Sequence, residues 1–138
     1  ASVAAVGVAA HEAGHAVQHA KNYAPIKVRN ALVPIVNIST SLSMPLFVIG
    51  LILSMTGLAL LGVILFSTAL LFQIVTLPVE FDASRRAIKI LSSGNLMYED
   101  EVRGARKVLS AAAMTYVAGA AATALQLLRL LLILRRDD

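Results

Sequence analysis

The feature that most constrains this chain is an uncharged stretch of fifty residues, Asn30–Val79. A helix needs about 20 apolar residues to cross a bilayer, so this stretch is too long for one crossing and suits two crossings joined by a turn. Met55–Gly57 offers the turn, which predicts a membrane hairpin over about residues 33–79. The whole chain is 58% hydrophobic and 14% charged, whereas soluble proteins are about 45–50% apolar and about 25% charged. We therefore expect an integral membrane protein.

Three further segments flank this hairpin. Residues 2–22 predict one alanine-rich helix, and residues 108–134 predict a further membrane helix. Residues 80–107 are polar, and their Ser-Ser-Gly-Asn run marks a loop between two short helices. Together these segments predict an all-α membrane protein with about three membrane helices, built as a single domain over residues 1–138. The chain opens with Ala1 and not Met, so we expect an upstream segment in the full protein.

Alanine and glycine are concentrated in residues 1–10 and again in residues 111–124. Small residues let two helices approach closely in lipid, where apolar burial alone does not drive helices together. We therefore expect these two segments to pack against each other, with Gly119 in the contact.

The distribution of charge predicts the orientation and the partners of the protein. Nine of the twelve lysines and arginines lie within residues 21–29 and 85–107, which predicts that both segments face the cytoplasm. These basic residues flank apolar segments and are not interleaved with aromatic residues, so no nucleic-acid partner is expected despite the net charge of +4. The expected partners are membrane lipid and a protein or peptide substrate, and assembly into a homo-oligomer is left open.

The sequence His11-Glu12-Ala13-Gly14-His15 matches the H-E-x-x-H pattern of zinc peptidases. Histidines four residues apart lie about 40° apart around a helix, so both imidazoles can reach one zinc ion. Glu12 lies beside the metal rather than on it, where a general base can take a proton from metal-activated water. The motif therefore predicts His11 and His15 as metal ligands and Glu12 as the catalytic base.

A rival pair of histidines has the same spacing. His15 and His19 are also four residues apart, but Ala16 stands where the base would be, so the first pair is favoured. His19, Gln18 and Asn22 share the metal-facing side of the helix. We interpret them as supporting polar residues rather than ligands.

The third ligand of such a site must be a carboxylate. A catalytic zinc usually has three protein ligands and one open position, and the chain has no cysteine and no further histidine. Glu80 and Asp82 stand at the end of the hairpin, and two crossings return the chain to the side of the histidine helix. We predict Glu80 as the third ligand and Asp82 as a residue that orients a histidine. The alternative for Glu80 is an interfacial carboxylate paired with Arg85 or Arg86.

Most of the chain resembles a known family, the YugP-like neutral zinc metallopeptidases of bacterial membranes. The resemblance rests on Ser2–Gln18, Val33-Pro34, Thr76–Ala87 with its P-V-E-F-x-A-S-R-R-A block, and Ala111–Ala118. It implies a zinc peptidase of the bacterial plasma membrane, with Glu80 as the third ligand.

The arrangement is also similar to that of the membrane gluzincins, in which a later E-F/Y-x-A segment supplies the ligand glutamate. Those proteins usually carry an aspartate four residues after this glutamate. Here that position holds Ser84, and Asp82 lies two residues after Glu80.

These observations predict a zinc-dependent membrane endopeptidase that hydrolyses peptide bonds with a metal-activated water. Tyr116 is the predicted donor to the oxyanion. Two alternatives remain. A site-2-type intramembrane protease would take its third ligand from a Leu-Asp-Gly-like segment, which this chain lacks. A membrane scaffold that holds zinc without catalysis would have no need of Glu12.

Overall fold

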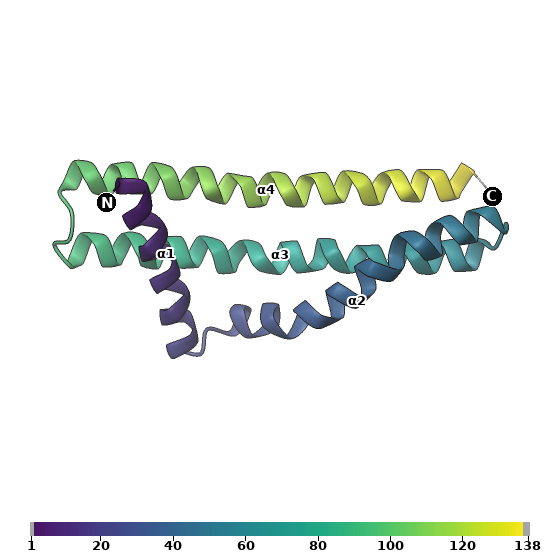
Figure 1. Ribbon diagram of the computed structural model, residues 1–138, viewed down its shortest axis with the longest axis horizontal. Coiled ribbons are helices and arrows are strands. Elements are labelled where there is room, and N and C mark those ends of the chain that lie inside the picture. The colour runs from purple at the N-terminus through teal and green to yellow at the C-terminus, as the bar shows by residue number, and fades with distance from the viewer. Residues whose placement is uncertain (1, 137–138) are drawn as a thin grey trace. The chain divides into compact units, whose positions relative to one another are not determined.

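The computed structural model describes residues 2–136, which form four α-helices joined by short connections (Figure 1). The helices are α1 (Val3–Ala20), α2 (Ala24–Ile52), α3 (Thr56–Ser93) and α4 (Glu99–Arg136). Three of them, α2, α3 and α4, are long and apolar enough to cross a membrane, by length and composition. The predicted all-α fold with three membrane helices is thereby confirmed.

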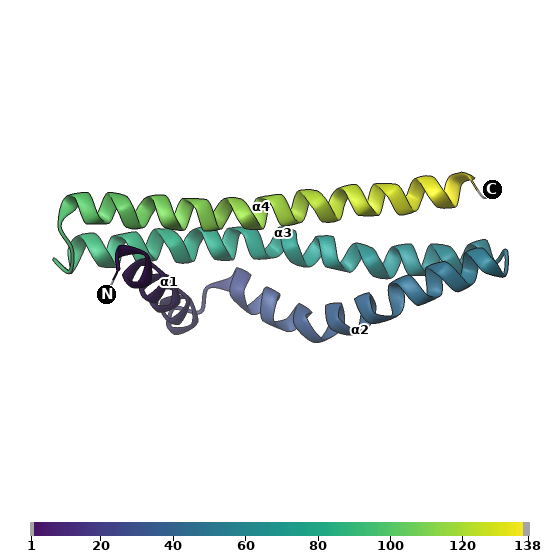
Figure 2. The same cartoon turned by 45° about the horizontal axis from the view of Figure 1, so that its top comes forward.

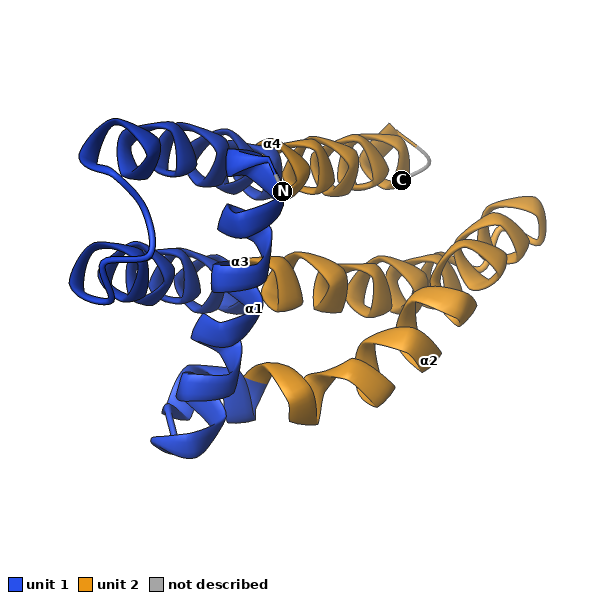
Figure 3. Ribbon diagram, turned by 60° about the vertical axis from the view of Figure 1, so that its left-hand side comes forward, with its two compact units in different colours: residues 1–28, 75–117 blue, residues 29–74, 118–138 orange. Residues whose placement is uncertain are grey.

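Two compact units divide these helices between them (Figure 3). Unit 1 contains Ala1–Val28 and Val75–Val117, and unit 2 contains Arg29–Ile74 and Ala118–Asp138. Unit 1 therefore holds α1 with its H-E-x-x-H motif, the end of α3 and the beginning of α4. The assignment of residues 1–138 to a single domain stays a prediction.

Local residue preferences explain both ends of α1. The Oγ atom of Ser2 accepts a hydrogen bond of 3.0 Å from the N–H of Ala5, which caps the start of the helix. The chain leaves α1 through Asn22, whose φ of 55° lies in the left-handed region that asparagine tolerates. Pro25 falls in the first turn of α2, where its missing N–H costs no helical hydrogen bond. The connection between α1 and α2 is therefore limited to residues 21–23.

The hairpin consists of α2 and α3, and both helices extend beyond residues 33–79. The turn lies at residues 53–55, where Ser54 has a φ of 54°, slightly earlier than the predicted turn. Helix α3 continues through Pro78 to Ser93, because a proline in a membrane helix can be accommodated by its neighbours. Residues 80–107 therefore do not form two short helices. They comprise the end of α3, the loop at 94–98 and the start of α4.

In unit 2, close contacts between small residues pack α2 against α3. Pro34 and Pro45 lie inside α2, and the helix is visibly curved (Figure 2), as expected where proline removes a backbone hydrogen bond. A Cβ atom at Gly50 would collide with the backbone of Ala59, and one at Gly62 would collide with the backbone of α2. The buried apolar cluster of this unit comprises Phe47, Ala59, Val63, Leu130 and Leu134.

In unit 1, α1 lies across the end of α3 and the beginning of α4 (Figures 1 and 2). The closest approach is at Gly14, where a Cβ atom would collide with the carbonyl of Ala83 on α3. A Cβ atom at Gly7 would lie 3.6 Å from the Cβ of Ala105 on α4, which is ordinary contact. The buried apolar cluster that α1 forms with α3 and α4 comprises Ala10, Ala87, Leu91, Val102, Ala105 and Leu109.

The predicted contact between residues 1–10 and residues 111–124 is wrong in its register. The first half of α1 instead contacts α4 around Ala105 and Leu109. A Cβ atom at Gly119 would have no neighbour within 4 Å, so a larger residue fits there. Small residues occur along much of α4, so their presence predicts close packing but does not determine where along the helix it occurs.

We expect the substitution Gly14→Ala to destabilise the protein, because the added methyl group would force α1 away from Ala83. Overpacking of this kind typically costs about 1–3 kcal/mol. Thermal unfolding in detergent measures the effect. The matched control is Gly57→Ala in α3, where nothing lies within 4 Å and alanine is the better helix former. Equal melting temperatures for the Gly14→Ala variant and the wild type would contradict the close contact.

Candidate metal centre

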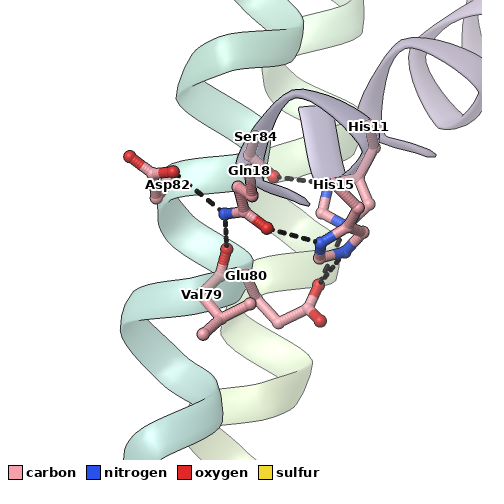
Figure 4. A network of polar contacts seen from close by, with 7 residues as sticks. All are labelled: His11, His15, Gln18, Val79, Glu80, Asp82 and Ser84. Atoms are coloured by element: carbon pink, nitrogen blue, oxygen red, sulfur yellow. Dashed lines mark hydrogen bonds and ion pairs between the residues drawn. The ribbon is translucent and has the colours of Figure 1, made fainter. Parts of the chain in front are cut away.

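Helix α1 places His11 and His15 one turn apart, with their rings 4.7 Å apart between centroids and nearly perpendicular at 89°. The Nε2 atoms of both rings face the carboxylate of Glu80 on α3 (Figure 4). The Oε2 atom of Glu80 lies 2.8 Å from Nε2 of His11 and 3.5 Å from Nε2 of His15. One ligand atom from each of the three residues lies within 4.8 Å of the others. The structure thus brings together the three residues predicted as ligands.

Packing between α1 and α3 positions Glu80 in this cluster. Gly14, between the two histidines on α1, touches the backbone of Ala83, which lies just under one turn beyond Glu80 on α3. Glu80 is the first charged residue after the uncharged stretch and is only 4% exposed. A carboxylate removed from water in this way interacts more strongly with a nearby cation than an exposed one does.

The second nitrogen of each imidazole has its own hydrogen-bond partner. Nδ1 of His15 lies 2.8 Å from Oε1 of Gln18, and Nδ1 of His11 lies 3.0 Å from Oγ of Ser84. An amide oxygen can only accept, so Nδ1 of His15 carries a hydrogen, and in the neutral imidazole Nε2 presents a lone pair toward Glu80. The Ser84 hydroxyl can donate or accept, so it can serve either tautomer of His11.

Gln18 is fully buried, and each of its polar atoms has a partner. Its Nε2 donates to the carbonyl of Val79 at 2.8 Å and to Oδ2 of Asp82 at 2.9 Å. Both partners are acceptors, which fixes the amide orientation with Oε1 toward His15 (Figure 4). The sequence placed Gln18 on the metal-facing side of the helix but did not reveal that it bridges His15 and Asp82.

Among the described residues, Asp82 makes no hydrogen bond to His11 or to His15. Its Oδ2 accepts from Gln18 and from Nε of Arg86 at 2.6 Å, and its Oδ1 lies 3.8 Å from Nη2 of Arg85. The predicted orienting role of Asp82 would therefore act through Gln18. Ser84 is the residue that sequence reasoning missed, although it occupies the position where the membrane gluzincins carry their aspartate.

The predicted catalytic base and the predicted donor to the oxyanion are both exposed side chains. Glu12 is exposed on α1 between the two histidines and makes no hydrogen bond or ion pair with any described residue. Tyr116 lies on α4 and is 42% exposed. Its assignment as the donor to the oxyanion stays a prediction.

We expect Gln18→Met to weaken zinc binding about 10–100-fold, the usual cost of removing a residue that orients a ligand. Methionine nearly preserves the side-chain volume but leaves His15 without its acceptor. Competition with a chromogenic chelator measures the affinity. The control is Gln126→Met on α4, outside the network. Unchanged affinity in the Gln18→Met variant would show that His15 is held by other contacts.

Comparison with known proteins identifies the family of the chain and one curated relative. Residues 1–135 match a family described as "Putative neutral zinc metallopeptidase". The chain is also 46% identical over 132 residues to the "Putative membrane protease YugP" of Bacillus subtilis (strain 168), an alignment that covers 96% of this chain and 59% of that protein. The chain thus spans about three fifths of the length of this curated relative. No solved structure matches this chain. The chain belongs to the family described as "Putative neutral zinc metallopeptidase".

Proposed function

We propose that this protein is a zinc-dependent membrane endopeptidase that hydrolyses peptide bonds with a metal-activated water. The observation that carries the proposal is the convergence of His11, His15 and Glu80 from two helices, with ligand atoms within 4.8 Å of one another. Glu12, the residue that a peptidase needs in addition, lies on the same helix between the two histidines. The family description and the name of the relative point to the same activity.

The chemistry of the three side chains fits a zinc ion. Two imidazoles and one carboxylate are a known ligand set for catalytic zinc. In the neutral form of His15, Nε2 faces the Oε2 atom of Glu80 at 3.5 Å with a lone pair, and two atoms with lone pairs repel each other unless positive charge lies between them. Bound here, zinc would supply a Lewis acid that polarises a carbonyl group and lowers the pKa of a water molecule to about 7.

The protein's own residues would supply the remaining steps. Glu12 is exposed and has no competing partner among the described residues, so its carboxylate is free to take a proton from the attacking water. The same carboxylate can then return the proton to the leaving amine. Gln18 and Ser84 hold the two imidazoles throughout the reaction, and Tyr116 is our proposed donor to the oxyanion.

The position of the site along α3 suggests where the substrate is cut. Glu80 follows directly after the uncharged part of α3, so the catalytic residues would lie near one surface of the membrane. The basic segments on the same side favour the cytoplasmic face of a bacterial plasma membrane. The substrates would then be membrane-associated proteins or peptides.

The residues of the site support the two alternative functions, a site-2-type protease and a zinc-holding scaffold, less well. A site-2-type protease would use a different third ligand, whereas here the carboxylate facing both histidines belongs to Glu80. A scaffold that only holds zinc would leave Glu12 without a purpose, since this side chain makes no hydrogen bond or ion pair in the described part of the chain.

We expect Glu12→Gln to retain zinc and to lose peptidase activity by about 10²–10⁴-fold, because the amide cannot take a proton. A fluorogenic peptide library measures the activity, and elemental analysis of the same sample measures zinc. The control is Glu99→Gln, an exposed acid at the start of α4. Activity close to wild type in the Glu12→Gln variant would refute the proposed base.

Removal of Glu80 tests the ligand set separately from catalysis. We expect Glu80→Gln to lose most of its bound zinc, while Asp82→Asn should lower the affinity by about 10–100-fold through the weakened hold on Gln18. Metal content after dialysis at a defined low concentration of free zinc measures both. Full occupancy in Glu80→Gln, with loss in Asp82→Asn, would mean that the other carboxylate is the ligand.

A further inference from the structure

A cavity of about 530 Å³ lies between α3 and α4 in unit 1. Apolar side chains form much of its wall, among them Phe81, Leu109, Ala113 and Met114, and two arginines, Arg85 and Arg106, line it as well. It therefore offers a ligand both an apolar surface and two positive charges.

The cavity lies at the level where both helices change from apolar to charged. Along α3 the uncharged stretch ends at Val79, and the cavity begins at Phe81. Along α4 the last basic residue before the apolar run is Lys107, and the cavity spans residues 106–114. If α3 and α4 cross the membrane, as proposed above, this level is the boundary between lipid headgroups and hydrocarbon.

The apolar part of the cavity is open toward its surroundings. Phe81 is 38% exposed and Met114 is 60% exposed, while Leu109 is buried at 4% and forms the inner wall. Large exposed apolar side chains at the level of the membrane boundary are suited to contact with acyl chains.

The two arginines are poorly neutralised within unit 1. The Arg85 side chain is 77% exposed, and its nearest carboxylate oxygen, on Asp82, is 3.8 Å away. That aspartate is held more closely by Arg86, at 2.6 Å. Arg106 makes no hydrogen bond or ion pair with any described residue. Guanidinium groups bind phosphate well because two N–H groups can donate to it in parallel.

We propose that this cavity binds an anionic phospholipid, with the phosphate at Arg85 and Arg106 and an acyl chain against Phe81, Leu109 and Met114. Basic pockets between membrane helices near the cytoplasmic surface are suited to anionic headgroups. Free phosphate would use the arginines but leave the apolar wall unoccupied. The proposal rests on the proposed membrane crossing but not on the peptidase activity.

Binding of a fluorescent phosphatidylglycerol to the full chain in detergent micelles tests this site, with the phosphatidylcholine analogue as the neutral comparison. We expect tighter binding of the anionic lipid, and a loss of about fivefold for each of Arg85→Gln and Arg106→Gln. The control is Arg103→Gln, which removes the same charge from an exposed position on α4 outside the cavity. Arg106→Gln is the cleaner of the two variants, because Arg106 is remote from the contacts of Asp82.

Three results would overturn the proposal. Equal losses of lipid affinity in Arg103→Gln and Arg106→Gln would mean that the lipid binds to general surface charge and not to this cavity. Inorganic phosphate that displaces the lipid at concentrations comparable to those of the lipid itself would indicate a plain phosphate site. Unchanged lipid binding, together with a raised KM for peptides in Arg106→Gln, would make the cavity part of the peptide-binding surface. Thermal unfolding confirms that each variant is folded.

Discussion

The candidate metal centre depends on the contact between Gly14 and Ala83. Because Gly14 has no side chain, the backbone of α1 rests on the carbonyl of Ala83, and His11 and His15 on either side of Gly14 reach the carboxylate of Glu80 nearby on α3. A metal ion bonds at about 2.0–2.2 Å to nitrogen and oxygen ligands, so the three groups must stay within a few ångströms of one another. A helix held further away by one methyl group would open the cluster. The glycine within the motif is therefore as necessary to the geometry as the ligands themselves.

Around this contact, a buried polar network fixes the direction of the imidazoles. Burying a glutamine side chain is costly unless its polar atoms are hydrogen-bonded, and Gln18 meets that condition with His15, Val79 and Asp82. Arg86 in turn holds the carboxylate of Asp82 and lies over the ring of Tyr23, 5.5 Å from its centroid. The hydrogen on Nδ1 of His15 is thus held by a chain of contacts that ends at Arg86, about one turn beyond Asp82 on α3.

Sequence reasoning predicted the parts of this structure that follow from spacing and from length. The four-residue spacing placed His11 and His15 on one side of a helix, and the length of the uncharged stretch implied two crossings, which brought Glu80 back to the histidines. The sequence did not reveal the role of Gln18 or of Ser84, because spacing places a side chain on a face but does not determine its partner. The register of α1 on α4 was missed for a related reason. Alanines and glycines are spread along α4, so the sequence alone does not show which of them contacts α1. In the folded chain Ala105 lies against Gly7 of α1, and a Cβ atom at Gly119 would meet nothing within 4 Å.

At the end of the uncharged run on α3, a carboxylate can stay charged and still attract a cation strongly. A carboxylate deeper in the apolar stretch would be very costly to keep charged, and one further out would be hydrated and would attract a cation less strongly. Glu80 lies at the boundary and is 4% exposed, next to the fully buried Val79. Glu12, on α1, is exposed and accessible to water, as the proposed catalytic base must be. A buried carboxylate suited to a metal ligand and an exposed carboxylate suited to a base can lie in one site because α1 crosses α3 here, where Gly14 allows the two helices to touch.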